Sequence, residues 1–63
     1  MGKMLIAGKE LDITAGTTIE QAVIDNGYHP DSFLYVVGGR PVPMDTVVTD
    51  NMVVKAMKVA SGG

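Results

Sequence analysis

The sequence contains no cysteine and no tryptophan, and its only aromatic residues are two tyrosines and one phenylalanine. Without cysteine the chain has no disulfide framework, no thiolate metal cluster and no side-chain thiol nucleophile. Its stability must therefore come from packing of the apolar residues, which make up 46% of the chain. This composition favours an intracellular protein.

Basic residues are also few, with five lysines and arginines against seven acidic residues and a formal charge of -2. That charge has the wrong sign for a phosphate-binding surface, so we expect no nucleic-acid partner. No apolar run approaches the roughly 20 residues that cross a bilayer, and no signal-peptide pattern is present. We therefore expect a soluble, cytoplasmic protein with no membrane partner. At 63 residues the chain can form only one small domain.

The first part of the chain predicts a β-hairpin. A short apolar run at residues 4–7 ends at Gly8-Lys9, and residues 10–14 then alternate between polar and apolar. The period of two places Leu11 and Ile13 toward the core. The intervening polar side chains then face water.

A helix is predicted next, after a break at Ala15-Gly16. Thr17 and Glu20 fit a capping box, in which each side chain satisfies a free backbone donor of the first turn. The apolar positions at helical spacing are Ile19, Ala22 and Val23. Asn26-Gly27 is a natural stop because glycine tolerates the left-handed conformation.

The second part of the chain predicts strands again. Residues 33–37 are apolar and, apart from Leu34, aromatic or β-branched, as in a strand inside a sheet, and Gly38-Gly39 forms a turn. Residues 40–43 can form only a short edge strand because each proline removes a ladder donor. A loop at residues 45–51 then leads to a last strand at residues 52–59.

The last strand is apolar on both faces, which is unusual in so small a domain. One face joins the core and consists of Met52, Val54 and Ala56. The other face carries Val53, Met57 and Val59 together with Lys55. A small sheet has nothing of its own to cover that second face, so we expect it to bind a partner.

These elements predict an α+β fold of order ββαββ, a mixed sheet covered by one helix. If the first and last strands lie side by side in the middle, they run parallel, as in a ubiquitin-like β-grasp. We expect a β-grasp domain at residues 1–59, followed by a flexible tail at residues 60–63.

The tail carries the chemistry that we expect of the chain. Gly62-Gly63 has no Cβ atoms that would obstruct a narrow channel. A free carboxylate is a poor electrophile, but adenylation by ATP makes it a mixed anhydride that a thiol, persulfide or amine attacks. A terminal glycine pair can also be incidental, so the order of elements is needed to favour this interpretation.

Four segments together resemble the sulfur-carrier proteins of thiamine and molybdopterin biosynthesis, and equally the small archaeal ubiquitin-like modifiers. They are residues 15–19, residues 39–43, residues 45–51 and the terminal Gly62-Gly63. The resemblance covers essentially the whole chain. One departure is Asp50-Asn51-Met52, where these families commonly have Asp-Gly-Asp. Asparagine still fits a left-handed turn position, whereas Met52 lacks the charge for an ionic contact.

The resemblance implies that a ubiquitin-activating-type enzyme adenylates Gly63 and that Gly62 is the flexible residue preceding it. The product is then a thiocarboxylate for thiamine, molybdopterin or tRNA thiolation, or an isopeptide bond to a target lysine. The partners implied are the adenylating enzyme and a sulfur-acceptor enzyme or protein targets. The docking surface implied includes Val53, Met57 and Val59. The chain itself is then no enzyme and binds no cofactor or metal, ATP being used by the activating enzyme.

Two alternatives stay open at this point. The chain can be a protein modifier joined through Gly63, or a plain interaction module. A single histidine, His29, lacks a second ligand at fixed spacing and predicts a loop residue rather than a metal site. The lysines predict solvated surface charge, although each is a chemically possible acceptor for modification. They are Lys3, Lys9, Lys55 and Lys58.

Overall fold

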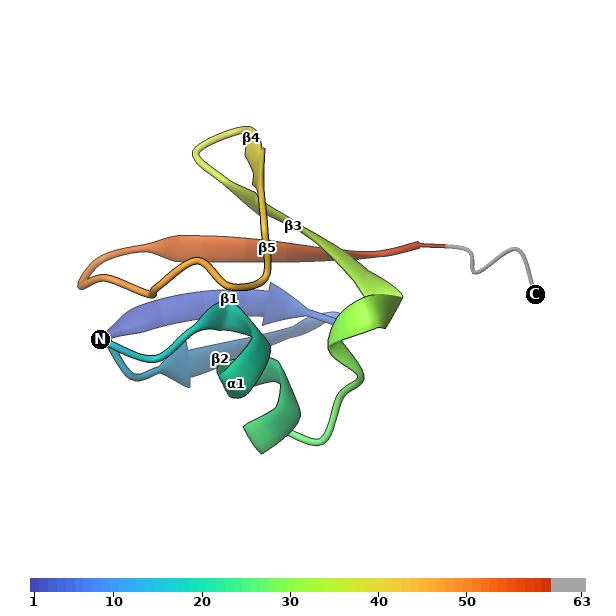
Figure 1. The fold of residues 1–63 in the computed structure, drawn as a ribbon, viewed down its shortest axis with the longest axis horizontal. Helices are drawn as coiled ribbons and strands as arrows, with labels where there is room; N and C mark the ends of the chain where they lie inside the picture. Colours follow the sequence, from blue (N-terminus) through green and yellow to red (C-terminus); the bar gives the residue numbers. More distant parts are fainter. Residues whose placement is uncertain (60–63) are drawn as a thin grey trace.

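A computed structural model describes residues 1–59 as a five-stranded sheet with one α-helix packed on one face (Figure 1). The elements in chain order are β1 (Gly2–Ile6), β2 (Lys9–Ile13), α1 (Ile19–Asp25), the 3-10 turn η1 (Pro30–Ser32), β3 (Phe33–Val37), β4 (Arg40–Val42) and β5 (Val53–Lys58). The domain is therefore of the α+β class, as predicted.

The strands lie in the order β2-β1-β5-β3-β4. β1 and β5 are parallel, whereas the other neighbouring pairs are antiparallel. The prediction that the first and last strands lie together in the middle of the sheet is confirmed. The predicted order ββαββ did not include the short edge strand. That strand is present as β4, so three strands follow the helix.

Both hairpins close through two-residue turns with positive φ at both positions. Ala7 and Gly8 have φ of 51° and 76°, and Gly38 and Gly39 have φ of 60° and 80°. Such turns match the right-handed twist of the strands that they join. The first strand therefore ends at Ile6 rather than at Ala7, because Ala7 takes a turn conformation.

The helix begins one residue later than the capping box predicted. Its N-cap is Thr18, whose hydroxyl oxygen accepts a hydrogen bond from the Gln21 N–H at 3.1 Å. Thr17 lies outside the helix because its carbonyl oxygen accepts from the Val48 N–H at 2.7 Å. The N-cap is thus Thr18 rather than Thr17, and no capping box closes within the described residues, because the Gln21 side chain donates to the Asp25 carboxylate at 2.8 Å instead.

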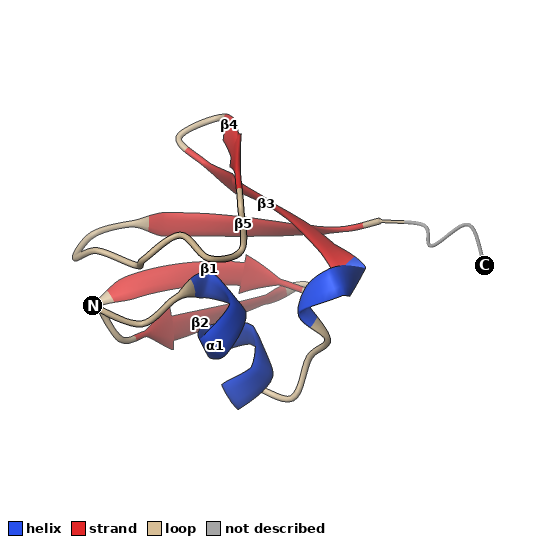
Figure 2. Cartoon of the chain, in the orientation of Figure 1, coloured by secondary structure: helices blue, strands red, loops and turns tan. Residues whose placement is uncertain are grey.

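The long connection between β4 and β5, residues 43–52, runs along the start of the helix (Figure 2). The carbonyl oxygens of Thr46 and Met44 accept from the first two helical N–H groups, Ile19 at 3.0 Å and Glu20 at 2.8 Å. These donors have no partner inside a helix. The loop therefore supplies the caps that a seven-residue helix cannot supply for itself.

The core lies between the helix, this loop and one face of the sheet. Ile13, Ile19, Ala22, Val23 and Val54 are buried there as predicted, and Leu11, Met52 and Ala56 are half-buried against them. Val48 is 1% exposed although it belongs to a loop. It packs beside Gly2, where an added Cβ would lie 2.8 Å from Val48 Cγ1. The first strand therefore needs glycine at this position.

The burial of Val48 predicts a specific stability difference between two adjacent valines. Val48→Ala should lower the free energy of unfolding by about 2 kcal/mol, because a buried valine side chain is lost from the core. Val47→Ala is the matched control, because Val47 is 51% exposed, and should change it by less than about 0.5 kcal/mol. Urea denaturation of both variants measures the difference. Equal losses would contradict the packing described for this loop.

Candidate functional site

The two glycines predicted to carry the chemistry, Gly62 and Gly63, lie outside the described residues. The last residue that is described is Val59, next to the end of β5. Its N–H donates to the carbonyl oxygen of Ser32 at 3.0 Å, and Lys58 pairs with Phe33 at the start of β3. The end of β5 is therefore held against the turn η1 and the start of β3.

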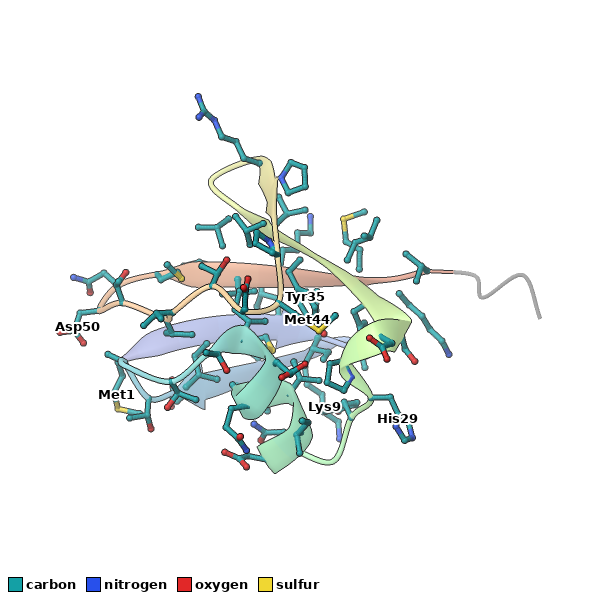
Figure 3. The ribbon with its side chains drawn as sticks, in the orientation of Figure 1. Met1, Lys9, His29, Tyr35, Met44 and Asp50 are labelled. Atoms are coloured by element: carbon teal, nitrogen blue, oxygen red, sulfur yellow. The ribbon has the colours of Figure 1, made fainter. Side chains whose placement is uncertain are left out.

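The turn η1 is itself held by a buried tyrosine. The Tyr35 hydroxyl donates to the Pro30 carbonyl oxygen at 2.7 Å, and Tyr35 is 3% exposed in the interior of the molecule (Figure 3). Burial raises the pKa of Tyr35 above its ordinary value, and the negative charges of Asp31 and Glu20 raise it further. The phenol thus stays neutral and remains a donor at physiological pH.

The sheet face opposite the helix, hereafter the open face, carries the apolar side chains of β5 predicted to bind a partner. Val53 and Met57 are each 49% exposed, and Val59 is half-buried at the end of the same row. Val54, between them, is fully buried on the helix side. The expected division of β5 into two apolar faces is confirmed, while partner binding stays a prediction.

Strand register brings further apolar side chains onto the open face that the sequence interpretation did not assign to it. Leu34 of β3 lies opposite Met57, and Leu5 of β1 and Val36 of β3 flank Lys55. Leu34 is 56% exposed and Leu5 38%. The signal was the period of two in residues 33–37, which separates Leu34 and Val36 from the buried Phe33 and Tyr35.

A single cation lies in the middle of this apolar area. Lys55 is exposed, and the ion pairs within residues 1–59 are Lys3 with Glu10 and the Met1 ammonium with Asp50, so Lys55 belongs to neither. The hydrogen bond to Glu10 raises the pKa of Lys3, whereas Lys55 lacks such a partner within these residues. The open face can therefore bury apolar area against a partner and offers the charge of Lys55, at the centre of that area, for orientation.

The turn before β5 keeps the geometry that the Asp50-Asn51-Met52 segment was expected to keep. Asn51 has φ of 67°, the left-handed conformation predicted for it. Asp50 accepts from the Met1 ammonium, which lies beside it (Figure 3), and this bond lowers the pKa of the Asp50 carboxyl. Met52 packs against the core, so an apolar residue serves this position.

Other site types find little support in the described part of the chain. Within residues 1–59, no three His, Asp or Glu side chains gather where they could hold a metal ion. No helix in this range has the length and apolarity needed to cross a membrane. Neither the protein-family models nor the curated proteins compared with this chain match it.

The hydrogen bond of Tyr35 makes a pH-dependent prediction. Tyr35→Phe should lower the free energy of unfolding by about 1 kcal/mol at neutral pH, because the Pro30 carbonyl loses its donor. The pKa of Tyr35 is higher in the folded protein than the pKa of about 10 of a tyrosine in the unfolded chain. The stabilisation is therefore complete below about pH 10 and is lost as the pH rises through the pKa of Tyr35 in the folded protein. The difference between wild type and variant should therefore shrink in alkaline solution.

Tyr28→Phe is the matched control, since its ring stacks edge-on against Phe33 and its hydroxyl has no hydrogen-bond partner within residues 1–59. It should change the free energy of unfolding by less than about 0.5 kcal/mol at neutral pH. Chemical denaturation at several pH values measures both variants. A Tyr35→Phe difference that grows in alkali would contradict the assignment.

Proposed function

We propose that this chain is a sulfur carrier whose terminal glycine is activated by an adenylating enzyme of the ubiquitin-activating type. In this proposal the folded body docks through its open face, and the residues after β5 deliver Gly63 to the active site of the partner. The chain is then a substrate of that enzyme and performs no catalysis itself.

The observation that carries the proposal is the position of β5. This strand bears Met57 and Val53 on the open face, and the sequence leads from it directly into Gly62 and Gly63. A partner that buries the open face therefore lies beside the strand that precedes the terminal glycines in the sequence. Docking and delivery are thereby coupled through one strand.

The fold supports this assignment. A mixed sheet with parallel β1 and β5 at its centre and one helix on one face is the arrangement that a β-grasp requires. On this basis, together with the resemblance of its sequence segments, we propose that the fold is a ubiquitin-like β-grasp. The Asn51 turn before β5 is consistent with the same family pattern.

The proposed chemistry takes place at one carbonyl carbon. The Gly63 carboxylate attacks the α-phosphate of ATP and displaces pyrophosphate, which leaves an acyl adenylate. A hydrosulfide-level sulfur donor then adds to the carbonyl carbon and displaces AMP, which gives a thiocarboxylate. If the amine of a target lysine attacks instead, the product is an isopeptide bond, and the chain is a modifier.

Intact-mass measurement distinguishes these outcomes. Protein isolated from its native cells should show a fraction whose mass corresponds to one sulfur in place of one oxygen at the C-terminus. Deleting Gly62 and Gly63 should abolish this species, because the activated carboxylate is lost, while the thermal midpoint stays unchanged. Gly-Gly remnants on lysines of other proteins would instead establish the modifier. If neither product forms and activity survives the deletion, the chain is an interaction module.

The docking role of the open face is tested separately. Met57→Asp should weaken adenylation by the activating enzyme about tenfold or more, because a charge replaces an exposed apolar anchor. Val47→Asp is the matched control, since it is equally exposed but lies in the loop before β5, away from the open face. Release of pyrophosphate measures both. Equal effects of the two variants would exclude the open face as the docking surface.

A further inference from the structure

The two edges of the sheet differ in what their backbones offer to another strand. At the β4 edge, Val37 and Arg40 close the two-residue turn and form a hydrogen-bonded pair. Hydrogen-bonded and non-bonded pairs alternate from there, so the backbone of the next residue, Pro41, points away from the sheet. Proline has no N–H, so this edge cannot donate at that position. The sheet is therefore blunted on the β4 side.

The β2 edge is not protected in this way. Ile6 and Lys9 close the first turn, so Glu10 and Asp12 belong to the pairs that do not bond to β1. Their backbone N–H and C=O groups point away from the sheet. On β1, the residues opposite Glu10 and Asp12 are Leu5 and Lys3, whose backbone groups point toward β5. The Lys3 N–H accordingly donates to the Met52 carbonyl oxygen at 2.8 Å. Within residues 1–59 no strand follows β2 on its outer side.

The side chains along this edge describe the strand that would fit it. Glu10 and Asp12 are exposed on the open face, whereas Leu11 and Ile13 lie on the helix side. Glu10 is paired with Lys3 at 2.8 Å, so Asp12 is the carboxylate of this edge without an ion-pair partner within residues 1–59. A hollow of about 130 Å³ adjoins the edge between β2 and α1, and its lining is mainly polar, with the buried Ile13 and Ala22 as its apolar members. An added strand would thus meet carboxylates on the open face and the half-buried Leu11 on the helix side.

We propose that the outer edge of β2 binds an extended segment of a partner protein in which basic and apolar residues alternate. The segment pairs antiparallel with β2, so that two of its basic residues lie directly across from Glu10 and Asp12. The apolar residues of the segment lie on the helix side, beside the half-buried Leu11. Main-chain hydrogen bonds give the segment its affinity for the edge, and its alternating basic and apolar side chains give the specificity.

A second copy of this chain fits the edge poorly. Antiparallel pairing of two β2 strands about a two-fold axis would bring Glu10 and Asp12 against the same residues of the other copy. Like charges directly opposite each other destabilise a strand pair, and acidic side chains on an edge oppose self-pairing. The charge of the edge therefore selects a basic partner. This inference does not depend on the proposed carrier function, since it uses neither β5 nor the terminal glycines.

The experiment is an NMR titration of the full chain, labelled with ¹⁵N, with a short capped peptide in which valine and lysine alternate. Hydrogen exchange at the Glu10 and Asp12 amides should become slower, because these N–H groups gain acceptors. The amides of β4 should not change. N-methylation of the lysines in the peptide should abolish the slowing, whereas N-methylation of the valines, whose amides point outward, should preserve it.

Asp12→Asn should weaken the peptide about two- to fivefold, the value of one cross-strand charge pair. Asp45→Asn removes the same charge from the exposed loop before β5 and should leave binding unchanged. Shifts centred on Met57 and Leu34, or equal effects of the two methylation patterns, would overturn the proposal. Slow exchange at Glu10 and Asp12 that increases with protein concentration alone would show that the occupant is a second copy, and would overturn it as well.

Discussion

The structure depends most on the hydrogen bonds between residues 43–52 and the start of the helix. A helix of seven residues is too short to be stable alone in water. Here its first N–H groups bond to Thr46 and Met44, and the segment before it bonds to Val48 in both directions, from the Gly16 N–H and to the Thr17 carbonyl. The same loop buries Val48 against Gly2. One connection therefore holds the helix, the core and the start of β5 in place.

This dependence explains which parts of the fold the sequence could predict. Periodicity located core residues of β2, α1 and β5, such as Ile13, Ile19 and Val54, because burial in these elements follows from local alternation. The choice between Thr17 and Thr18 as N-cap could not be made locally, since each begins an acceptable capping pattern. A bond from Val48, far along the chain, decides it. The burial of Val48 and the need for Gly2 are equally non-local.

The same division holds for the candidate site. Val53 and Met57 could be assigned to an exposed face because β5 is apolar on both sides within its own sequence. Placing Leu5 and Leu34 beside the exposed residues of β5 requires the register of β1 and β3 against β5, which local patterns do not specify. Gly62 and Gly63 were predicted from their chemistry, the order of elements and the resemblance, and they lie outside the described residues. Their role therefore depends on the resemblance and on the direction in which β5 runs.

The open face and the β2 edge use different physical interactions, and this difference allows them to act together. The open face offers apolar side chains around Lys55, centred on β5 and β3, whereas the outward groups of β2 are backbone amides and carbonyls. β1 separates the two strands. Burial of Met57 and Leu34 by one protein therefore leaves the Glu10 and Asp12 backbone accessible to another. The Glu10 and Asp12 carboxylates project onto the same face as Lys55 but at its β2 margin, so a partner centred on Lys55 and a strand added at β2 meet charges of opposite sign.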